Sequence, residues 1–513
     1  MEALLAALDA AVMPLNLAYM FAGVLVGIVF AAIPGLTIFM AIVLTLPFTF
    51  TMSPIQGLTT MLGVYVGGLS GGLIASILLG IPGNPASIPT LFDGHPMARK
   101  GEPGRALAIG IMASFFGGLI GVAILIFLAP PILILGLMFG PWEIFALVAF
   151  ALSILASLGG GSVAKSLMAG MFGLFIATIG IDPIQGSMRL TFGLEGLSGG
   201  VNLLPAVIGL YAFSSLVTGV EESVRPGAAT LAAHVVRREW MRRPPYLQAA
   251  REVLGQPVNL IRSAVIGCLV GALPGAGSST GSFLAYDQAK KLSRNPAEFG
   301  TGSPRGIVAS EAGNSSVAPG ALVMTLGLGI PGDPGGALML GALMIHGINP
   351  GPLLYQEQPV LVSAVFIALV LAHPAMLLCH FIGLRWFIRA SFTPKHYLFP
   401  IVFVFCIVGA YTANYQLFDL WVFLAFGLIG YAFTRWQIPL EPVALALILG
   451  PMAEINLRRA LMTNPDPMLF LTRPISATLL AIAAVSLVVS IWQAKRIRPT
   501  NPELGVGRAG GRP

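Results

Sequence analysis

Long apolar segments separated by short polar stretches make up most of this chain. Residues 12–48 and 55–91 carry no charged side chain, several more apolar segments lie between 106 and 220, and others fill 258–285 and 358–492. A helix needs about 20 apolar residues to span a bilayer, so these segments leave room for roughly ten to fourteen membrane helices. The pattern predicts an all-α polytopic membrane protein in contact with a lipid bilayer.

Two of the apolar segments contain nearly the same interruption. The sequence GIPGNP occupies residues 80–85, and GIPGDP occupies residues 329–334. Proline lacks a backbone donor and glycine adds backbone freedom, so each copy should break a membrane helix. A second pair of interruptions, AIPG at 32–35 and ALPG at 272–275, precedes them in the same order. The chain is therefore predicted to be a tandem duplication with two broken or re-entrant helices in each half.

Composition and charge support the membrane assignment. Hydrophobic residues make up 56% of the 513 positions and charged residues only 10%, whereas a soluble domain carries roughly a quarter of its residues as charges. The net charge of +7 comes from basic residues in the loops, which is typical of topogenic signals and not of a nucleic-acid-binding stripe. These loops predict a first membrane half at 1–220, a basic cytoplasmic linker at 221–257, a second half at 258–494 and a cytoplasmic tail at 495–513.

The loop charges also predict how the halves are oriented. In the first half, the loop between the two breaks (49–54) is uncharged and the loop after the second break (99–105) is basic. In the second half, the loop between the breaks (287–305) is basic and the loop after GIPGDP carries no charge. This reciprocal pattern predicts two inverted-topology repeats. It also requires residues 258–285 to return to their starting face as a hairpin.

Small and uncharged polar residues at or near the breaks are the candidate substrate ligands. Helix N-termini, with hydroxyl and amide side chains beside them, can hold a carboxylate. The candidates are Pro34, Gly35, Gly83, Asn84, Ser87, Gly275, Gly277, Ser278, Ser279, Thr280, Asn314, Ser315 and Gly332. A structural interpretation stays open for the polar members, in which they cap broken helices or bind neighbouring helices.

Two acidic residues are the candidates for cation coupling. Asp333 stands in the second break at the position of Asn84 in the first, and Glu311 lies among small residues. A carboxylate inside a membrane segment is costly, so both predict coupling to sodium or a proton. Alternatives stay open for each: Asp333 as the N-cap of a half-helix that begins at Pro334, and Glu311 as a loop or cap residue.

The sequence offers no catalytic or metal-binding pattern. It contains no His-Glu-x-x-His or Walker motif, and its three cysteines have no paired spacing. His373 and His380 lie seven positions apart without further ligands, which favours a structural role. We therefore expect a protein that is not an enzyme and has no catalytic residues, no metal and no cofactor beyond the coupling cation.

The motifs together resemble the large membrane subunit of the tripartite tricarboxylate transporters over most of residues 15–455. The most specific motifs are at 79–83, 93–97, 273–277, 311–314, 328–333 and 351–352. The resemblance implies a multi-pass permease of the bacterial inner membrane that works with a small membrane subunit and a periplasmic solute-binding protein. It implies import of di- or tricarboxylates, or related organic anions, driven by a cation gradient.

The chain departs from the pattern of that family at two positions. Ser315 stands where a second asparagine is usual, a difference that bears on substrate choice, and Arg305 stands where an acidic residue usually precedes Gly306. A secondary transporter explains the duplication and the paired breaks. A carboxylate or ion channel, and a stand-alone secondary transporter without a binding protein, remain the alternatives.

Overall fold

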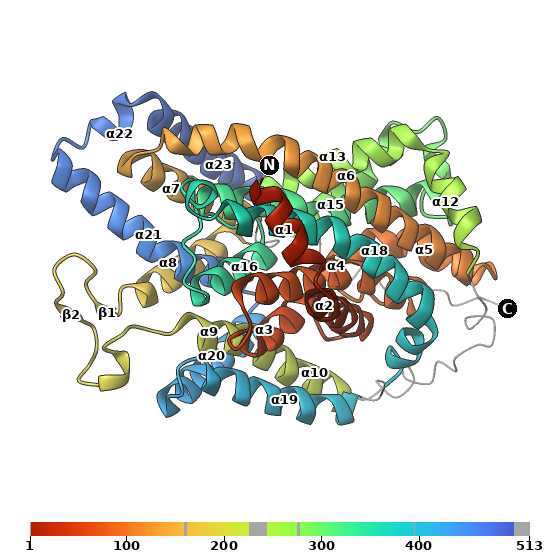
Figure 1. Cartoon of the computed structure of the whole chain (residues 1–513), viewed down its shortest axis with the longest axis horizontal. Coiled ribbons are helices and arrows are strands. Elements are labelled where there is room, and N and C mark those ends of the chain that lie inside the picture. The colour runs from red at the N-terminus through yellow and green to blue at the C-terminus, as the bar shows by residue number, and fades with distance from the viewer. Residues whose placement is uncertain (1, 159–161, 225–243, 274–276, 394, 497–513) are drawn as a thin grey trace.

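The computed structural model describes residues 2–158, 162–224, 244–273, 277–393 and 395–496 (Figure 1). The described residues are almost entirely helical, apart from a short antiparallel hairpin of β1 (Gly180–Ile181) and β2 (Met188–Arg189). The all-α polytopic prediction is thus confirmed. About half of the predicted linker, nearly all of the predicted tail and Gly275 lie outside the described residues, so the predicted domain boundaries stay predictions.

The described elements are as follows. In the first half of the chain they are α1 (Glu2–Val12), α2 (Pro14–Ala32), α3 (Ile38–Thr49), α4 (Pro54–Leu79), η1 (Pro85–Ser87), α5 (Ile88–Arg99), α6 (Pro103–Leu137), α7 (Pro141–Leu158), α8 (Val163–Ala177), η2 (Glu195–Leu197), α9 (Leu203–Val207), η3 (Ile208–Phe213) and α10 (Ser214–Val224). In the second they are α12 (Tyr246–Leu254), α13 (Pro257–Ala272), α14 (Gly277–Lys291), η5 (Pro296–Glu298), α15 (Pro304–Leu328), α16 (Pro334–Ile345), α17 (Leu354–Glu357), α18 (Pro359–Ala390), α19 (Lys395–Thr412), α20 (Leu417–Arg435), α21 (Glu441–Thr463), α22 (Leu469–Thr472) and α23 (Pro474–Arg496).

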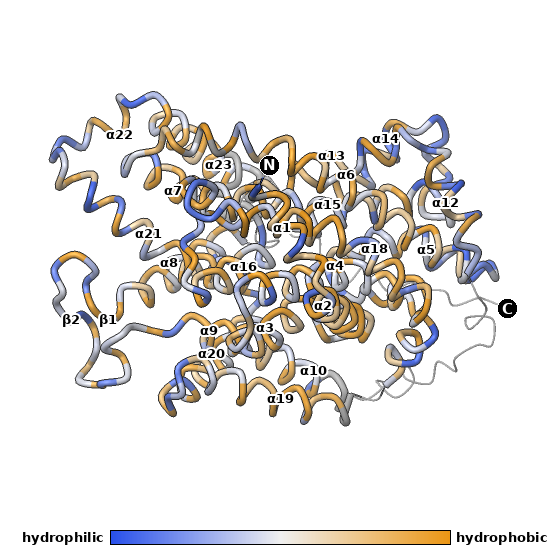
Figure 2. The backbone as a smooth tube through the Cα atoms, in the orientation of Figure 1, coloured by the Kyte–Doolittle hydropathy of each residue, from blue (hydrophilic) through white to orange (hydrophobic). Residues whose placement is uncertain are grey.

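Fewer helices than expected are long enough to cross a membrane. Six helices of the described chain have the length and composition of a span, or seven if the bent pair α12 and α13 counts as one. The prediction of roughly ten to fourteen membrane helices is higher because it assumes that all of the apolar sequence forms full-length spans. In the structure, part of that sequence forms shorter apolar helices such as α3, α8 and α16. Hydrophilic stretches gather around α12 and α14 at one end and around α21 and the hairpin at the other (Figure 2).

The predicted breaks at AIPG and at the two GIPG motifs are all present in the described residues. Helix α2 ends at Ala32 and α3 begins at Ile38. Helices α4 and α15 both end at a left-handed glycine, Gly80 with φ of 68° and Gly329 with φ of 71°. A glycine adopts this conformation without a Cβ clash, so the same residue type terminates both helices.

The duplication is visible in how the long helices pack. Helix α2 lies against α4, and α13 lies against α15. A Cβ at Gly27 would lie 2.2 Å from the carbonyl oxygen of Val64, and one at Gly267 would lie 2.0 Å from that of Gly313. Val64 and Gly313 are 249 positions apart, the same offset as between the GIPG motifs. The two halves therefore use equivalent glycines for equivalent close contacts.

The second break of each half packs in the same way. A Cβ at Gly83 would lie 2.8 Å from the Cα of Gly72, and one at Gly332 would lie 2.9 Å from the Cα of Ala321. Both pairs again differ by the offset of 249 positions. Each break thus folds back onto the long helix that precedes it, because the glycine lets the two backbones approach closely.

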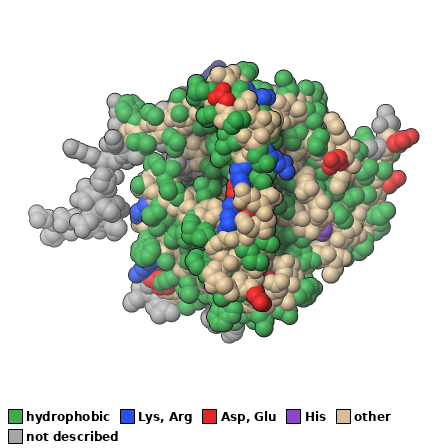
Figure 3. All heavy atoms as spheres, turned by 90° about the vertical axis from the view of Figure 1, so that its left-hand side faces the viewer, with side chains coloured by type: hydrophobic (Ala, Val, Ile, Leu, Met, Phe, Trp, Pro, Cys, Tyr) green, Lys and Arg blue, Asp and Glu red, His purple; other side chains and the backbone are tan. Residues whose placement is uncertain are grey.

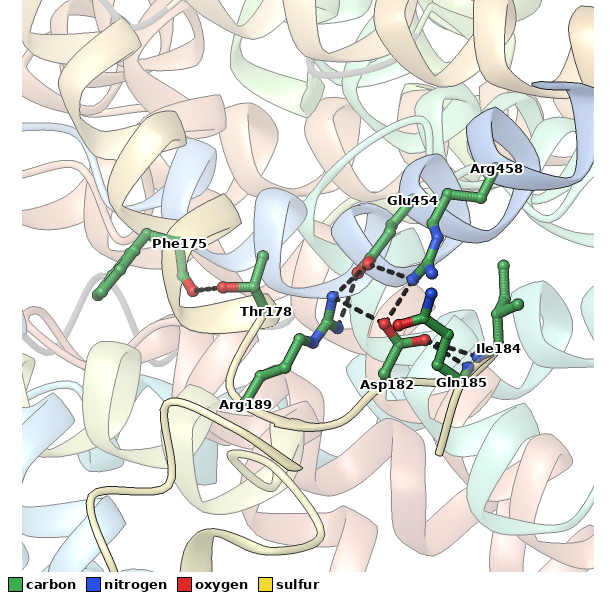
Figure 4. A network of polar contacts seen from close by, with 8 residues as sticks. All are labelled: Phe175, Thr178, Asp182, Ile184, Gln185, Arg189, Glu454 and Arg458. Atoms are coloured by element: carbon green, nitrogen blue, oxygen red, sulfur yellow. Dashed lines mark hydrogen bonds and ion pairs between the residues drawn. The ribbon is translucent and has the colours of Figure 1, made fainter. Parts of the chain in front are cut away.

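The β1–β2 hairpin is held to α21 by a network of charged side chains. Figure 3 shows the face of the molecule at this end, where basic and acidic side chains gather near the centre among apolar ones. In the network, the carboxylate of Asp182 accepts hydrogen bonds from the amides of Gln185 and Ile184 at 2.9 and 2.8 Å and pairs with Arg458 at 2.5 Å (Figure 4). These partners, the Gln185 amide most of all, hold the pKa of Asp182 below its usual range.

We expect this network to stabilise the fold in a pH-dependent way. The pKa of Asp182 is lower in the folded protein than in the unfolded chain, where it is about 3.9. Its carboxylate therefore adds stability above that value, and the contribution is lost as pH falls below it. Asp182→Asn should lower the midpoint of thermal unfolding at pH 7, and the difference from the wild type should shrink below about pH 4.

Asp9→Asn, at an exposed position of α1, serves as the control and should leave the midpoint unchanged. A gap between Asp182→Asn and the wild type that is constant from pH 7 to pH 3 would contradict the assigned role of the carboxylate.

Candidate substrate and cation site

One face of α4 carries most of the candidate residues. Tyr65, Leu69, Gly72 and Ser76 are spaced by four, three and four residues, so they line a single helix face over about 16 Å. All four are buried. Polar groups from both breaks and from α15 attach to this row of positions, which makes α4 the element that joins the candidates from the two halves.

The first break attaches to the end of this row. Asn84 is the N-cap of η1, and its Oδ1 accepts a hydrogen bond from the Ser87 amide at 2.8 Å. The Ser87 hydroxyl also receives a hydrogen bond from Ser76 Oγ at 2.8 Å. Asn84 Nδ2 lies over Gly72, where a Cβ would be only 2.6 Å away, and it has no hydrogen-bond partner. The side chain is 5% exposed, so the break presents one buried, unused donor.

Asn314 reaches the same row from α15. The sequence places Asn314 and Ser315 near a break, but both lie in the interior of α15, well before its end at Leu328. That expectation was wrong, because small and polar residues in this segment continue a helix that neighbouring helices bury on all sides. Asn314 Nδ2 donates to the Leu69 carbonyl at 2.9 Å, and Asn314 Oδ1 has no partner. The Ser315 hydroxyl is also buried without a partner.

Glu311 lies one turn before Asn314 and is fully buried. It is neither a loop nor a cap residue, since it sits inside α15. Its carboxylate accepts hydrogen bonds from Thr90 Oγ1 at 2.5 Å and from Ser114 Oγ at 2.8 Å. The partners are hydroxyl groups of α5 and α6, which stabilise a buried carboxylate by hydrogen bonding but leave its charge without a cation.

Asp333 is the N-cap of the half-helix α16. This is one of the two roles that the sequence predicts for it. Its Oδ1 accepts a hydrogen bond from the Gly336 amide at 2.7 Å. Its Oδ2 accepts a second hydrogen bond from the phenol of Tyr65 on α4. Asp333 is fully buried and Tyr65 is 1% exposed. Tyr65 is a residue that the sequence reasoning missed, although it stands alone in a glycine-rich apolar run.

The other candidates lie at the starts of two helices, α14 and α3, which contact different breaks. Helix α14, whose first turn holds Gly277, Ser278, Ser279 and Thr280, lies against η1 and the first half's break. Helix α3, which follows Pro34 and Gly35, lies against α16 and the second half's break. Each of these two breaks therefore contacts a helix from the other half. Gly83 and Gly332 serve the close backbone packing described above.

The motif at 93–97 has a structural function that the sequence did not indicate. The buried Asp93 Oδ1 accepts hydrogen bonds from the amides of Gly300, Gly302 and Ser303 at 2.7–2.9 Å. Its Oδ2 accepts one from the Tyr286 hydroxyl at 2.9 Å. A single side chain of the first half thus fixes the loop that leads into α15 of the second.

His373 and His380 lie buried in α18, as the structural interpretation predicts. His373 Nδ1 lies 2.8 Å from the Leu369 carbonyl oxygen, and His380 Nε2 lies 3.0 Å from Ser70 Oγ. Among the described residues no group of three or more His, Cys, Asp or Glu side chains is placed to hold a metal ion.

A cavity of about 230 Å³ borders α16 away from these polar groups. It is lined mainly by apolar side chains such as Leu338 and Met344, with the amides of Asn202 and Asn414 at its wall. An apolar lining offers little to an organic anion. The polar groups on α4 are therefore the better candidate for substrate contact.

Comparison with known proteins gives a consistent assignment. Residues 17–445 match the family described as "Tripartite tricarboxylate transporter TctA family". The chain is 33% identical over 489 residues, 95% of both chains, to the "Uncharacterized 52.8 kDa protein in TAR-I ttuC' 3'region" of Agrobacterium vitis. It is 33% identical over 231 residues, 45% of this chain and 96% of the relative, to the "Uncharacterized protein in TAR-II ttuC' 3'region" of that organism. No solved structure matches. With its multi-pass helical fold, the chain belongs to the TctA family and is a component of a tripartite tricarboxylate transporter.

Proposed function

We propose that this chain is the permease subunit of a binding-protein-dependent secondary transporter that imports di- or tricarboxylates across the bacterial inner membrane. A cation gradient, of sodium or protons, drives the import. A small membrane subunit and a periplasmic solute-binding protein work with it, the latter delivering substrate to the outer face. Membership of the family and the paired breaks support this proposal.

The observation that carries the proposal is the pair of buried amides with one unused atom each. Backbone hydrogen bonds fix both orientations: Asn84 Oδ1 is held by the Ser87 amide, and Asn314 Nδ2 by the Leu69 carbonyl. The free atoms are therefore a donor on Asn84 and an acceptor on Asn314. A buried polar atom without a partner is costly, so a ligand that hydrogen-bonds to both atoms removes that cost.

The surroundings favour a carboxylate as that ligand. Helix α14, whose first turn carries hydroxyl groups, lies against η1 at this break, where Asn84 offers its donor. Backbone amides at a helix N-terminus attract an anion. A carboxylate oxygen accepts from Asn84, and a hydroxyl or protonated carboxyl group of the same molecule suits Asn314.

The two buried acids are the proposed cation ligands. Glu311 shares α15 with Asn314, and Asp333 shares the α4 face with both amides, so a cation bound at either acid lies close to the bound anion. An anion and a cation in one low-dielectric site stabilise each other, which is the physical basis for coupled uptake.

The proposal places the basic loops in the cytoplasm and relates the halves as inverted repeats. It is supported by the reciprocal loop charges and by the exchange in which each GIPG break contacts a helix from the other half. Single cysteines at positions 99 and 290 should both escape a membrane-impermeant label added outside intact cells. Labelling of either one contradicts the inverted arrangement.

The transport site is tested with the chain reconstituted in proteoliposomes together with its small subunit and binding protein. Uptake of labelled succinate and citrate should be saturable and should follow an imposed sodium or proton gradient. Asn84→Ala and Asn314→Ala should each weaken substrate binding, because a hydrogen bond to a charged group contributes about 1.5–3 kcal/mol, or roughly 10- to 150-fold in affinity.

Asn295→Ala, at an exposed loop amide, is the matched control and should transport like the wild type. Carboxylate uptake that does not saturate and does not depend on the cation gradient would indicate a channel instead. Full uptake by the purified chain alone would contradict dependence on a binding protein. Unchanged substrate affinity in both amide variants would show that the substrate does not bind to these amides beside α4.

Cation coupling is tested by Asp333→Asn and Glu311→Gln. Asparagine is a good N-cap, and it already serves at the equivalent position 84, so Asp333→Asn should fold while losing the charge. Each variant should bind substrate but show a changed or lost dependence of uptake on the imposed gradient. If both variants accumulate substrate with the wild-type gradient dependence, these acids do not bind the coupling cation.

A further inference from the structure

The two halves contain equivalent sites that differ in one decisive residue. Tyr65 in α4 corresponds to Asn314 in α15, and Asn84 corresponds to Asp333, each pair being 249 positions apart. The matched packing of Val64 with Gly27 and of Gly313 with Gly267, directly beside these positions, shows that the correspondence holds in space. We call Asn84 with Asn314 the first half-site, and Asp333 with Tyr65 the second half-site.

In the second half-site the protein fills the space itself. The phenol of Tyr65 reaches Asp333 and donates a hydrogen bond to its Oδ2. The ring packs over Gly335, where an added Cβ would lie 2.6 Å from ring carbons. Both polar groups are buried, the phenol donor is used and the ring fills the space beside Gly335, so this half-site offers a carboxylate no free side-chain donor.

The first half-site has no aromatic ring at the position that corresponds to Tyr65. Asn314 is shorter than a tyrosine by most of an aromatic ring and binds the Leu69 carbonyl instead. Gly72, against which Asn84 packs, is one turn further along α4. The result is one unpaired donor on Asn84 and one unpaired acceptor on Asn314, both on side chains at least nine-tenths buried.

We propose that Tyr65 occupies the second half-site permanently and thereby makes the duplicated permease a carrier with one carboxylate site. The phenol stands at the position equivalent to the free space beside Asn84 and Asn314, and the carboxylate of Asp333, unlike the amide of Asn84, has no donor for an anion. Tyr65 is thus a specificity-determining residue that sets how many substrate molecules bind. The inference rests on the proposed function, since it takes the first half-site as the carboxylate site.

The test is the number of carboxylates bound per chain, measured by equilibrium dialysis with labelled succinate and with labelled citrate on the purified complex. The wild type should bind one. The double variant Tyr65→Asn/Asp333→Asn, which places the residue pair of the first half-site in the second, should bind two. Each single variant should still bind one, because Asp333→Asn keeps the ring and Tyr65→Asn keeps a carboxylate where the first half-site has an amide donor.

A double variant with the same substitutions at exposed positions, Tyr415→Asn/Asp466→Asn, should bind one and controls for the loss of a tyrosine and an acid. The reciprocal variant Asn314→Tyr, which puts a ring into the first half-site, should bind none while its midpoint of thermal unfolding shows that it is folded. This second arm decides the question even if the double variant does not fold.

The outcomes separate the two claims. A wild type that binds neither probe overturns the proposed function and this inference with it. A wild type that binds one carboxylate, with a folded double variant that also binds one, overturns the inference alone. So does a wild type that binds two, or an Asn314→Tyr protein that still binds one.

Discussion

Backbone groups that leave a helix inside a bilayer must find a partner within the protein, because hydrocarbon offers none. This protein meets that constraint at each GIPG break with a side-chain cap and a close glycine contact. Asn84 and Asp333 accept hydrogen bonds from the amides of Ser87 and Gly336 in the first turns of η1 and α16. Gly83 and Gly332 let the chain fold back onto α4 and α15. Most other features of the candidate site depend on how these two breaks are satisfied.

The same constraint explains why the candidate site lies on α4. A break can be buried only against a helix without bulky side chains, and α4 supplies Gly72 at the place where Asn84 packs. Once both breaks and α15 lie on one helix, their polar side chains meet in a region that water does not reach. Groups such as Glu311 and the two unpaired amide atoms then interact strongly with any charged ligand, because a low dielectric strengthens electrostatic interactions.

Local chemistry made part of this arrangement predictable from sequence. The breaks at Pro34 and in the two GIPG motifs follow from residues that cannot continue a helix, and Asp333 as an N-cap follows from its place before Pro334. The interior placement of Asn314 and Glu311 did not follow, since polar residues favour helix ends unless tertiary contacts bury them. The partners Tyr65 and Thr90 lie 268 and 221 positions from Asp333 and Glu311, and no local pattern pairs residues over such separations.

The central claim is that a carboxylate binds at the first half-site, between Asn84, Asn314 and the first turn of α14. An experimental structure of the complex with bound citrate tests it most directly. The account predicts density for the anion within hydrogen-bond distance of Asn84 Nδ2 and Asn314 Oδ1, with the Tyr65 phenol still on Asp333. Density for citrate beside Asp333, or in the apolar cavity along α16, with the first half-site left empty, would contradict it.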